Sequence, residues 1–412
     1  MRHVTFACLL VCHALACSGP KPAPRAAESR PCDLPATSAN APTPDAFVLA
    51  GSDFVQKARA KSEPDLYRNA ETCAAKALEL DPDHLGALRL QGLVMLNDHQ
   101  FERARDLALK MLARKSEDAL TWGTLSDAYL ELGDMPAAID AAQRMLDIKP
   151  NLPSYGRAAH LRWLQGDAVS AKRLYQLAIG SGTGQKDPEP RAWMIVQAAW
   201  LFWHEGDYRG ADFGFDAALR RLPEYAPALE GKGRVALSER DYPAAIDWLT
   251  RAERAKPTAP VSALLGDAYA LAGATDKAAQ VYARVEREGR HDPRSVASFL
   301  ATHDRKASEA LELARTEWKQ RKDVYTKDVL ALALYRNGQV TEADKLAREV
   351  VASGIQDAGL LYHAGLIRRA AARDQAGKAE GQALMADALR KNPRLDPILT
   401  GERNATELAQ NR

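Results

Sequence analysis

Residues 122–150 read WGTLSDAYLELGDMPAAIDAAQRMLDIKP, and this stretch decides the fold. Apolar residues stand at Trp122 and at the positions three and seven further on, a spacing that puts them on one face of a helix. Gly133 ends that helix, because glycine readily takes the left-handed conformation that follows a helix C-terminus. Pro136 suits the first turn of a second helix, and the final proline stops it. The stretch therefore predicts a pair of helices joined by a tight turn.

The same pattern recurs along the chain. It is marked by a column of alanines at intervals of 34, 34, 33, 40, 34, 33, 32 and 33 residues: Ala70, Ala104, Ala138, Ala171, Ala211, Ala245, Ala278, Ala310 and Ala343. A Gly or Asp turn signal precedes most of these alanines by about four residues. A fixed period of this length is the signature of stacked helical repeats. One pair cannot cover its own apolar face, so each pair must stack on the next.

At these positions the chain resembles the tetratricopeptide repeat (TPR) family. The family pattern W-x2-L-G-x2-Y, then A-x3-F, then P is met in residues 122–150, with Ser126 at the place of the glycine. Partial matches occur at Leu88/Gly92/Ala104, Ala171/Tyr175/Ala178, Ala211/Phe215/Ala218/Pro223, Leu229/Gly233/Ala245/Pro257 and Leu265/Gly266/Tyr269/Ala278/Tyr282. The resemblance implies an all-α fold, a right-handed TPR superhelical solenoid of about ten helix-turn-helix repeats.

The repeat array is expected to span residues 51–401, with residues 402–412 as a tail. Its units start near residues 51, 85, 119, 152, 192, 226, 259, 291, 324 and 358. The first, eighth and tenth units are degenerate. The eighth lacks Gly and Pro at its turns, and the tenth carries extra residues before a second helix over 382–389. A Gly- and Pro-rich insertion at 180–190 predicts a local bulge between two sub-arrays of one continuous superhelix.

The N-terminus has the form of a lipoprotein signal peptide over residues 1–17. An apolar run of 13 residues follows a short basic start, and it is too short to span a bilayer. Ala14-Leu15-Ala16-Cys17 resembles the lipobox of bacterial lipoproteins, which implies that Cys17 is lipidated. Ser18 suits sorting to the outer membrane. We therefore expect a lipid-anchored envelope protein on the periplasmic face of the outer membrane, with plain secretion or an uncleaved cytosolic start as alternatives.

Residues 18–50 follow as a predicted disordered tether, rich in Pro and Ala, which would hold the array away from the membrane surface. Beyond the signal region the chain has two cysteines, Cys32 and Cys73. They could pair in an oxidising compartment. The sequence favours the other interpretation, in which Cys73 packs among the alanines of a helix and Cys32 is an unpaired thiol.

Charge and motifs limit the classes of function. The chain has 56 basic and 54 acidic residues mixed along its length, a net charge of +2 that argues against nucleic acid as a partner. Gly180 to Lys186 breaks the spacing of a phosphate-binding loop. The histidines lack metal-site spacing, and no G-x-S-x-G motif is present. We expect no enzyme: no catalytic residue, no metal, no cofactor and no small-molecule substrate.

What remains is recognition of proteins. The resemblance implies a protein or peptide ligand on a concave groove lined by the first helices of the repeats. Carried over to this chain, the protein-binding residues are Trp163, Trp193, Val196, Trp200, Trp203 and His204. Equivalent positions of neighbouring units hold Arg89, Asp127, Glu230, Arg234, Asp267 and Asp328. Core packing between repeats is the alternative role for the tryptophans, and we expect at least two of the four rings to be accessible.

The sequence thus predicts a non-enzymatic envelope scaffold or adaptor, tethered to a membrane through Cys17 and binding partners through its repeats. The alternative is an accessory or regulatory subunit of an envelope enzyme, such as a peptidoglycan hydrolase or a protease.

Overall fold

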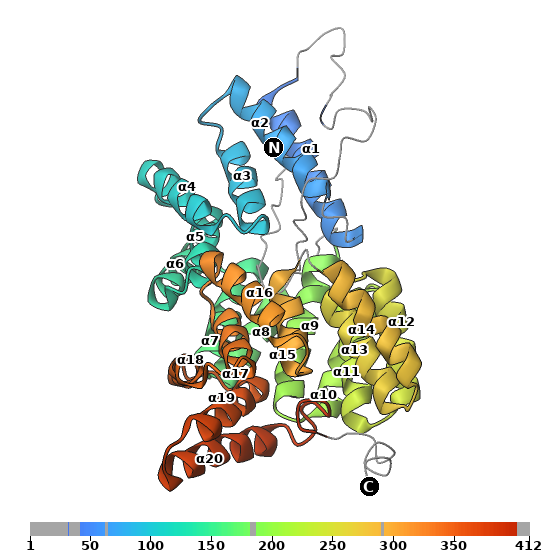
Figure 1. Cartoon of the computed structure of the whole chain (residues 1–412). Helices are drawn as coiled ribbons and strands as arrows, with labels where there is room; N and C mark the ends of the chain where they lie inside the picture. Colours follow the sequence, from blue (N-terminus) through green and yellow to red (C-terminus); the bar gives the residue numbers. More distant parts are fainter. Residues whose placement is uncertain (1–31, 33–41, 62–64, 182–186, 290–291, 402–412) are drawn as a thin grey trace. The chain divides into compact units, whose positions relative to one another are not determined.

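The computed structural model describes residues 32, 42–61, 65–181, 187–289 and 292–401 (Figure 1). The chain divides into two compact units, residues 1–158 and 159–412, and each is described by itself. In unit 1 the helices are α1 Pro44–Lys61, α2 Asp65–Leu80, α3 Leu85–Asn97, α4 Phe101–Arg114, α5 Ala119–Glu131 and α6 Met135–Ile148. The boundary falls inside α7, Leu152–Leu164.

Unit 2 continues the all-α pattern. Its helices are α8 Ala168–Ser181, α9 Glu189–His204, α10 Tyr208–Leu219, α11 Ala226–Glu239, α12 Tyr242–Ala255, α13 Ala259–Leu271, α14 Thr275–Glu288, α15 Pro293–Thr302, α16 Ala307–Gln320, α17 Val324–Arg336, α18 Val340–Ala352, α19 Ala358–Ala371 and α20 Gln375–Lys391. The described part of the chain contains twenty helices and no strand, which confirms the predicted fold of about ten helix pairs. Odd-numbered helices are the first helices of the pairs, and even-numbered helices are the second.

The pair α5–α6 shows how one repeat forms. Gly133 has a φ of 84° and ends the first helix in the left-handed region, where a side chain would be strained. The Asp134 carboxylate accepts a hydrogen bond from the Ala137 N–H and caps the second helix. The Ser126 hydroxyl donates to the Ala138 carbonyl across the pair at 2.8 Å. The two backbones can approach this closely because both residues are small.

The alanines that recur in the sequence lie at the contact between the two helices of each unit that contains one. All nine alanines, from Ala70 to Ala343, are between 0 and 3% exposed. Ala138 and Ala211 are both fully buried. At such sites the surrounding side chains and backbone leave room for a methyl group and little more.

The structure differs from the sequence prediction at two boundaries. Helix α1 begins at Pro44, inside the stretch taken as tether, and α20 begins at Gln375 rather than near 382. The eighth unit, without a turn glycine, places Asp304 and Lys306 at φ values of 53° and 42° instead. Non-glycine residues in this region cost on the order of 1 kcal/mol each, which the packing of α15 and α16 must offset. Of the insertion at 180–190, residues 182–186 lie outside the described part.

Unit 1 contains a disulfide bond between Cys32 and Cys73. The preference for an unpaired Cys32 was therefore wrong. The Cα atoms lie 5.5 Å apart, within the usual range for a disulfide. Cys32 packs with Phe47 and Val48 of α1, and the Lys76 ammonium group donates to its carbonyl oxygen. The bond fixes Cys32 to α2.

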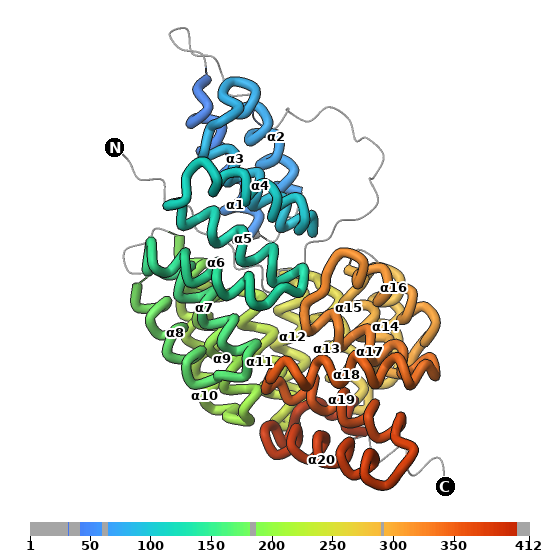
Figure 2. Tube along the Cα trace, turned by 90° about the vertical axis from the view of Figure 1, so that its left-hand side faces the viewer, coloured from blue at the N-terminus to red at the C-terminus, as the bar shows by residue number. Residues whose placement is uncertain are grey.

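Unit 2 closes on itself, so that its last helices contact its first ones. Figure 2 shows the chain passing from α8–α10 in green through α11–α14 in yellow to α19 and α20 in red. One core cluster joins Val196 and Trp203 of α9 to Leu361 of α19 and Ala388 of α20. On α17, seven consecutive residues (328–334) are buried, so that helix is covered on all sides. An open solenoid would leave one side of its first helices exposed.

Candidate functional site

The aromatic residues predicted to bind partners lie on α7 and α9. On α9 the Trp200 and Trp203 rings meet edge to face, with centroids 5.8 Å apart. The guanidinium group of Arg234 on α11 lies 5.7 and 5.5 Å from the two ring centres. Trp203 is 3% exposed, and its indole N–H donates to the Ser238 hydroxyl. Trp200 stays half-buried, against Phe215 of α10.

Trp163 and His204 meet where α7 and α9 contact the last repeats. The Trp163 ring lies 5.0 Å from the His204 imidazole, and its indole N–H donates to the Tyr325 hydroxyl of α17 at 3.1 Å. The Asp357 carboxylate lies 3.4 Å from His204 Nδ1. Burial lowers the pKa of His204 in spite of this carboxylate. Both residues therefore help to close unit 2.

Trp193 and Val196 complete the predicted set. Val196 is fully buried in the core cluster of α9 and α19. Trp193 is half-buried, and within the described residues its indole nitrogen has no hydrogen-bond partner. Of the four tryptophans, Trp163 and Trp203 are buried and the other two keep partial exposure. The structure brings the predicted residues together on α7 and α9, and their role in binding stays a prediction.

Carboxylates on the first helices of unit 2 pair with histidines. Asp267 accepts from the Tyr282 hydroxyl at 2.6 Å, and His303 Nε2 lies 2.7 Å from the same oxygen. Asp328 on α17 contacts His363 Nδ1 at 2.7 Å. Burial opposes the charge on both histidines, but the nearby carboxylates outweigh it and raise the pKa of each. The interior of unit 2 thus contains two histidine–carboxylate pairs.

His160 on α7 has the opposite environment. It is 7% exposed, and burial lowers its pKa to about 4, although Asp323 partly opposes the shift. His160 is therefore neutral near pH 7.

The residues between α20 and the end of the described chain were not singled out by the sequence. We name residues 392–401, NPRLDPILTG, the C-terminal segment. Asn392 is fully buried: its amide donates to the Trp203 carbonyl at 2.8 Å and accepts from the Tyr208 hydroxyl at 2.5 Å. The Arg394 guanidinium donates to the Ser238 carbonyl at 3.3 Å. The segment is thereby attached to α9, α10 and α11.

The apolar and acidic residues of the C-terminal segment also pack against helices of unit 2. Leu395 is 5% exposed and belongs to the core cluster of Val196 and Trp203. Ile398 packs on the cluster formed by α11, α12 and α13. The Asp396 carboxylate accepts from the Ile398 and Leu399 N–H groups and lies near Asp267, Arg234 and His303. The segment is received by residues on the first helices or directly after them. We name these residues the inner surface of unit 2: Val196, Trp203, Arg234, Ser238, Asp267 and His303.

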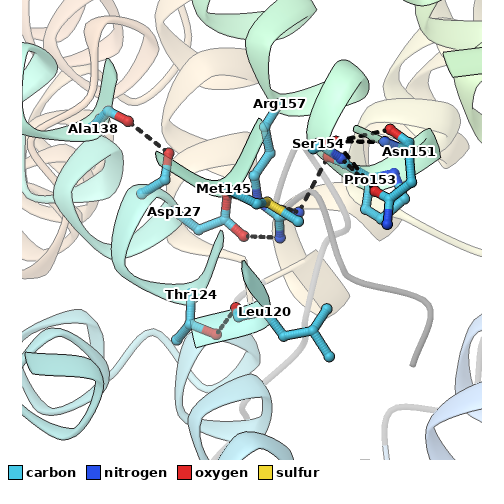
Figure 3. A network of polar contacts seen from close by, with 10 residues as sticks. Leu120, Thr124, Asp127, Ala138, Met145, Asn151, Pro153, Ser154 and Arg157 are labelled. Carbon is cyan, nitrogen blue, oxygen red and sulfur yellow. Dashed lines mark hydrogen bonds and ion pairs between the residues drawn. The ribbon is translucent and has the colours of Figure 1, made fainter. Parts of the chain in front are cut away.

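In unit 1 the equivalent positions form two ion pairs, one half-buried and one buried. Arg89 donates to Asp118 through two nitrogens, and Arg157 does the same to Asp127, at 2.8 and 2.6 Å (Figure 3). Asp127 is 5% exposed and Arg157 is 2% exposed. The positions that the family pattern assigns to ligand contact thus make structural contacts within the chain.

Three further points concern the lipobox cysteine, metal binding and membrane-spanning helices. Cys17 lies outside the described residues, so the structure does not bear on its lipidation. Among the residues that are described, no group of three or more His, Cys, Asp or Glu side chains is placed to hold a metal ion. None of the helices in the described ranges combines the length and hydrophobicity needed to cross a bilayer.

Comparisons with known proteins agree with this fold. The family model described as tetratricopeptide repeat matches residues 96–153 and 196–260. No curated protein matches the chain. The chain is an all-α TPR solenoid.

Solved structures with a similar fold share little sequence. The Cut9–Hcn1 hetero-tetramer of the APC/C is 17% identical over 70% of this chain, with a TM-score of 0.49, and the match spans 55% of that chain. A tetratricopeptide repeat protein from Parabacteroides merdae is 15% identical over 67% of this chain and 98% of its own, with a TM-score of 0.43. A human IFIT1 dimer with m7Gppp-AAAA is 14% identical over 84% of this chain and 85% of its own, with a TM-score of 0.48. At these values the likeness is one of fold alone.

Proposed function

We propose that this protein is a non-enzymatic scaffold or adaptor of the cell envelope. It binds partner proteins or peptides on the inner surface of unit 2, while a lipidated Cys17 holds it at a membrane. The observation that carries the binding part is the C-terminal segment, because a non-helical stretch of chain already lies across α9, α11 and α13. A surface that accepts one such stretch through backbone and aliphatic contacts is suited to accept another.

The envelope location rests on two further observations. Ala14-Leu15-Ala16-Cys17 has the form of a lipobox. The Cys32–Cys73 disulfide is typical of proteins in oxidising compartments, where such bonds form and persist. Together they favour an exported protein on the periplasmic face of the outer membrane.

The absence of a catalytic role is part of the proposal. Histidine–carboxylate pairs occur in many active sites, but the pair in unit 2 that is nearest to the C-terminal segment serves the fold. Both ring nitrogens of His303 contact protein oxygens, of Phe299 and Asp267. The near balance of 56 basic and 54 acidic residues favours a protein partner over nucleic acid.

Substitution of the lipobox cysteine tests the anchor. We expect Cys17→Ala to move the protein from the membrane pellet to the soluble fraction, or to leave it as an unprocessed precursor, because the lipid can no longer be attached. Fractionation of cells and metabolic labelling with a palmitate analogue give the readout. A wild-type protein that takes up no label would refute lipidation.

Site-specific photocrosslinking tests partner binding. A photoreactive phenylalanine analogue in place of half-buried Trp200 is expected to capture a partner in intact cells. The same residue in place of Phe213, which is 70% exposed on α10, serves as the control. Mass spectrometry then identifies the captured protein. Capture from Phe213 alone would place the partner elsewhere, and a peptidoglycan hydrolase or protease as the captured partner would favour the accessory-subunit alternative.

A further inference from the structure

The C-terminal segment occupies the surface proposed for partners. It follows α20 directly and belongs to none of the described helices. It passes so close to the α9–α10 turn that a Cβ atom on Gly206 would lie 3.0 Å from the Lys391 carbonyl and 3.1 Å from Pro393 Cδ. The Asn392 contact to Trp203 joins residues 189 positions apart. The segment is therefore a tertiary element, held by helices from three to five repeats earlier.

The contacts define what kind of sequence the inner surface recognises. Leu395 fills the core cluster of α9, and Ile398 covers the cluster of α11 and α13. Between them the Asp396 carboxylate lies near the Arg234 guanidinium and the His303 imidazole. The pattern is an aliphatic residue, then an acidic residue, then two more aliphatic residues after one position.

The C-terminal segment is only partly buried against the inner surface of unit 2. Pro393 and Arg394 are exposed, and residues 396–400 are only half-buried. Asp396 also faces the carboxylate of Asp267, and two like charges at close range repel each other. An element with few fully buried side chains and an unfavourable charge contact is of the kind that opens locally while the rest of the fold persists.

We propose that the C-terminal segment is an exchangeable, built-in ligand that covers the inner surface of unit 2, and that partner segments carrying the same aliphatic–acidic–aliphatic pattern displace it. This inference rests on the proposed function, since it names the chemistry of the partner at the same surface. A segment tied directly to α20 has an effective concentration in the millimolar range. A free peptide with equal contacts therefore binds poorly until the segment is released.

Peptide binding to a released variant tests the proposal. The probe is a fluorescein-labelled peptide of residues 391–401, and its binding to the full chain in detergent is followed by fluorescence anisotropy. In the released variant, Leu395→Asp with Ile398→Asp puts charges where the segment needs apolar side chains. We expect this variant to bind the probe at least ten-fold more tightly than wild type. Arg390→Gln, at an exposed position of α20 just before the segment, should behave as wild type.

Two further measurements sharpen the result. A probe with Asp396→Lys should bind the released variant at least ten-fold more weakly, because a lysine cannot accept the hydrogen bonds that the Asp396 carboxylate takes from the Ile398 and Leu399 N–H groups. Hydrogen exchange on the wild type covers the case in which the released variant does not fold. An excess of unlabelled peptide should then speed exchange of the amides of residues 392–401 and leave α9 and α13 protected.

The proposal fails if a folded released variant binds the probe no better than wild type. It also fails if residues 392–401 exchange only together with α9 and α13, because the segment is then a fixed part of the fold. Crosslinking of a partner through Trp200 with no peptide exchange would overturn this inference alone. Peptide exchange without any crosslinked partner would instead count against the proposed function.

Discussion

Replacing Ala211 with Arg is expected to lower the free energy of unfolding of unit 2 by about 3 kcal/mol or more. Ala211 is fully buried at the contact between α9 and α10, in the same core cluster as Phe215 and Trp203. An arginine there would force these helices apart and place a charge where no partner is available. Helices α9 and α10 should therefore lose their protection first.

Hydrogen exchange followed by mass spectrometry can localise this loss. Phe213→Arg is the matched control, because it introduces the same side chain on the same helix at a position that is 70% exposed. Repeats depend mainly on their neighbours, so α1 to α4 in unit 1 should keep their protection in both variants. A melt of Ala211→Arg that matches the control would refute the role assigned to the alanine column.

The repeat architecture could be predicted because its determinants are local. Small residues such as Ala138, turn residues such as Gly133 and caps such as Asp134 recur with the period of the fold. Each acts within one helix pair or between neighbours. The starts of nine of the ten units, all except the first, accordingly lie within a few residues of the expected positions.

The inner surface of unit 2 could be predicted only in part. The family pattern predicted that Trp163, Trp203 and His204 lie close together, and they do. It could not show that α17 and α19 would cover them, because that closure depends on contacts between distant repeats. The C-terminal segment left a weak signal, the dipeptides Asn392-Pro393 and Asp396-Pro397, which mark the end of the helical pattern. No local rule indicates where such a stretch will dock.

The repeat pattern also gave a wrong prediction for the role of the charged residues on the first helices. Asp127 stands at a position that the family assigns to ligand contact, yet it is 5% exposed and bound by Arg157 from the next repeat. A sequence periodicity identifies which helix face a residue occupies. Whether another repeat covers that face is decided by the fold.

Removing one partner of this buried ion pair should also cause a large loss of stability. Arg157→Ala is expected to destabilise unit 1 by about 3–5 kcal/mol, the usual loss when one partner of a buried ion pair is removed. The Arg157 guanidinium holds both carboxylate oxygens of Asp127 and also donates to the Pro153 carbonyl (Figure 3). Without it, the Asp127 carboxylate would stay in the interior with no compensating charge.

The pH dependence of the loss identifies its cause. Burial already raises the pKa of Asp127, and Arg157 opposes this rise. In Arg157→Ala the folded-state pKa should climb further above the unfolded value of about 3.9. The folded variant then binds a proton more readily than the unfolded chain, so part of the lost stability should return as the pH falls from 7 toward 5.

Urea denaturation at pH 7 and pH 5, with hydrogen exchange on α5 as the local readout, measures both effects. Asp127→Leu combined with Arg157→Met is the matched control, because two apolar side chains of similar size replace the pair without leaving a charge behind. We expect this double variant to recover most of the stability that the single variant loses, and to lack its gain at low pH. Equal losses in the two variants would show that packing around Arg157, rather than the unpaired carboxylate, accounts for the effect.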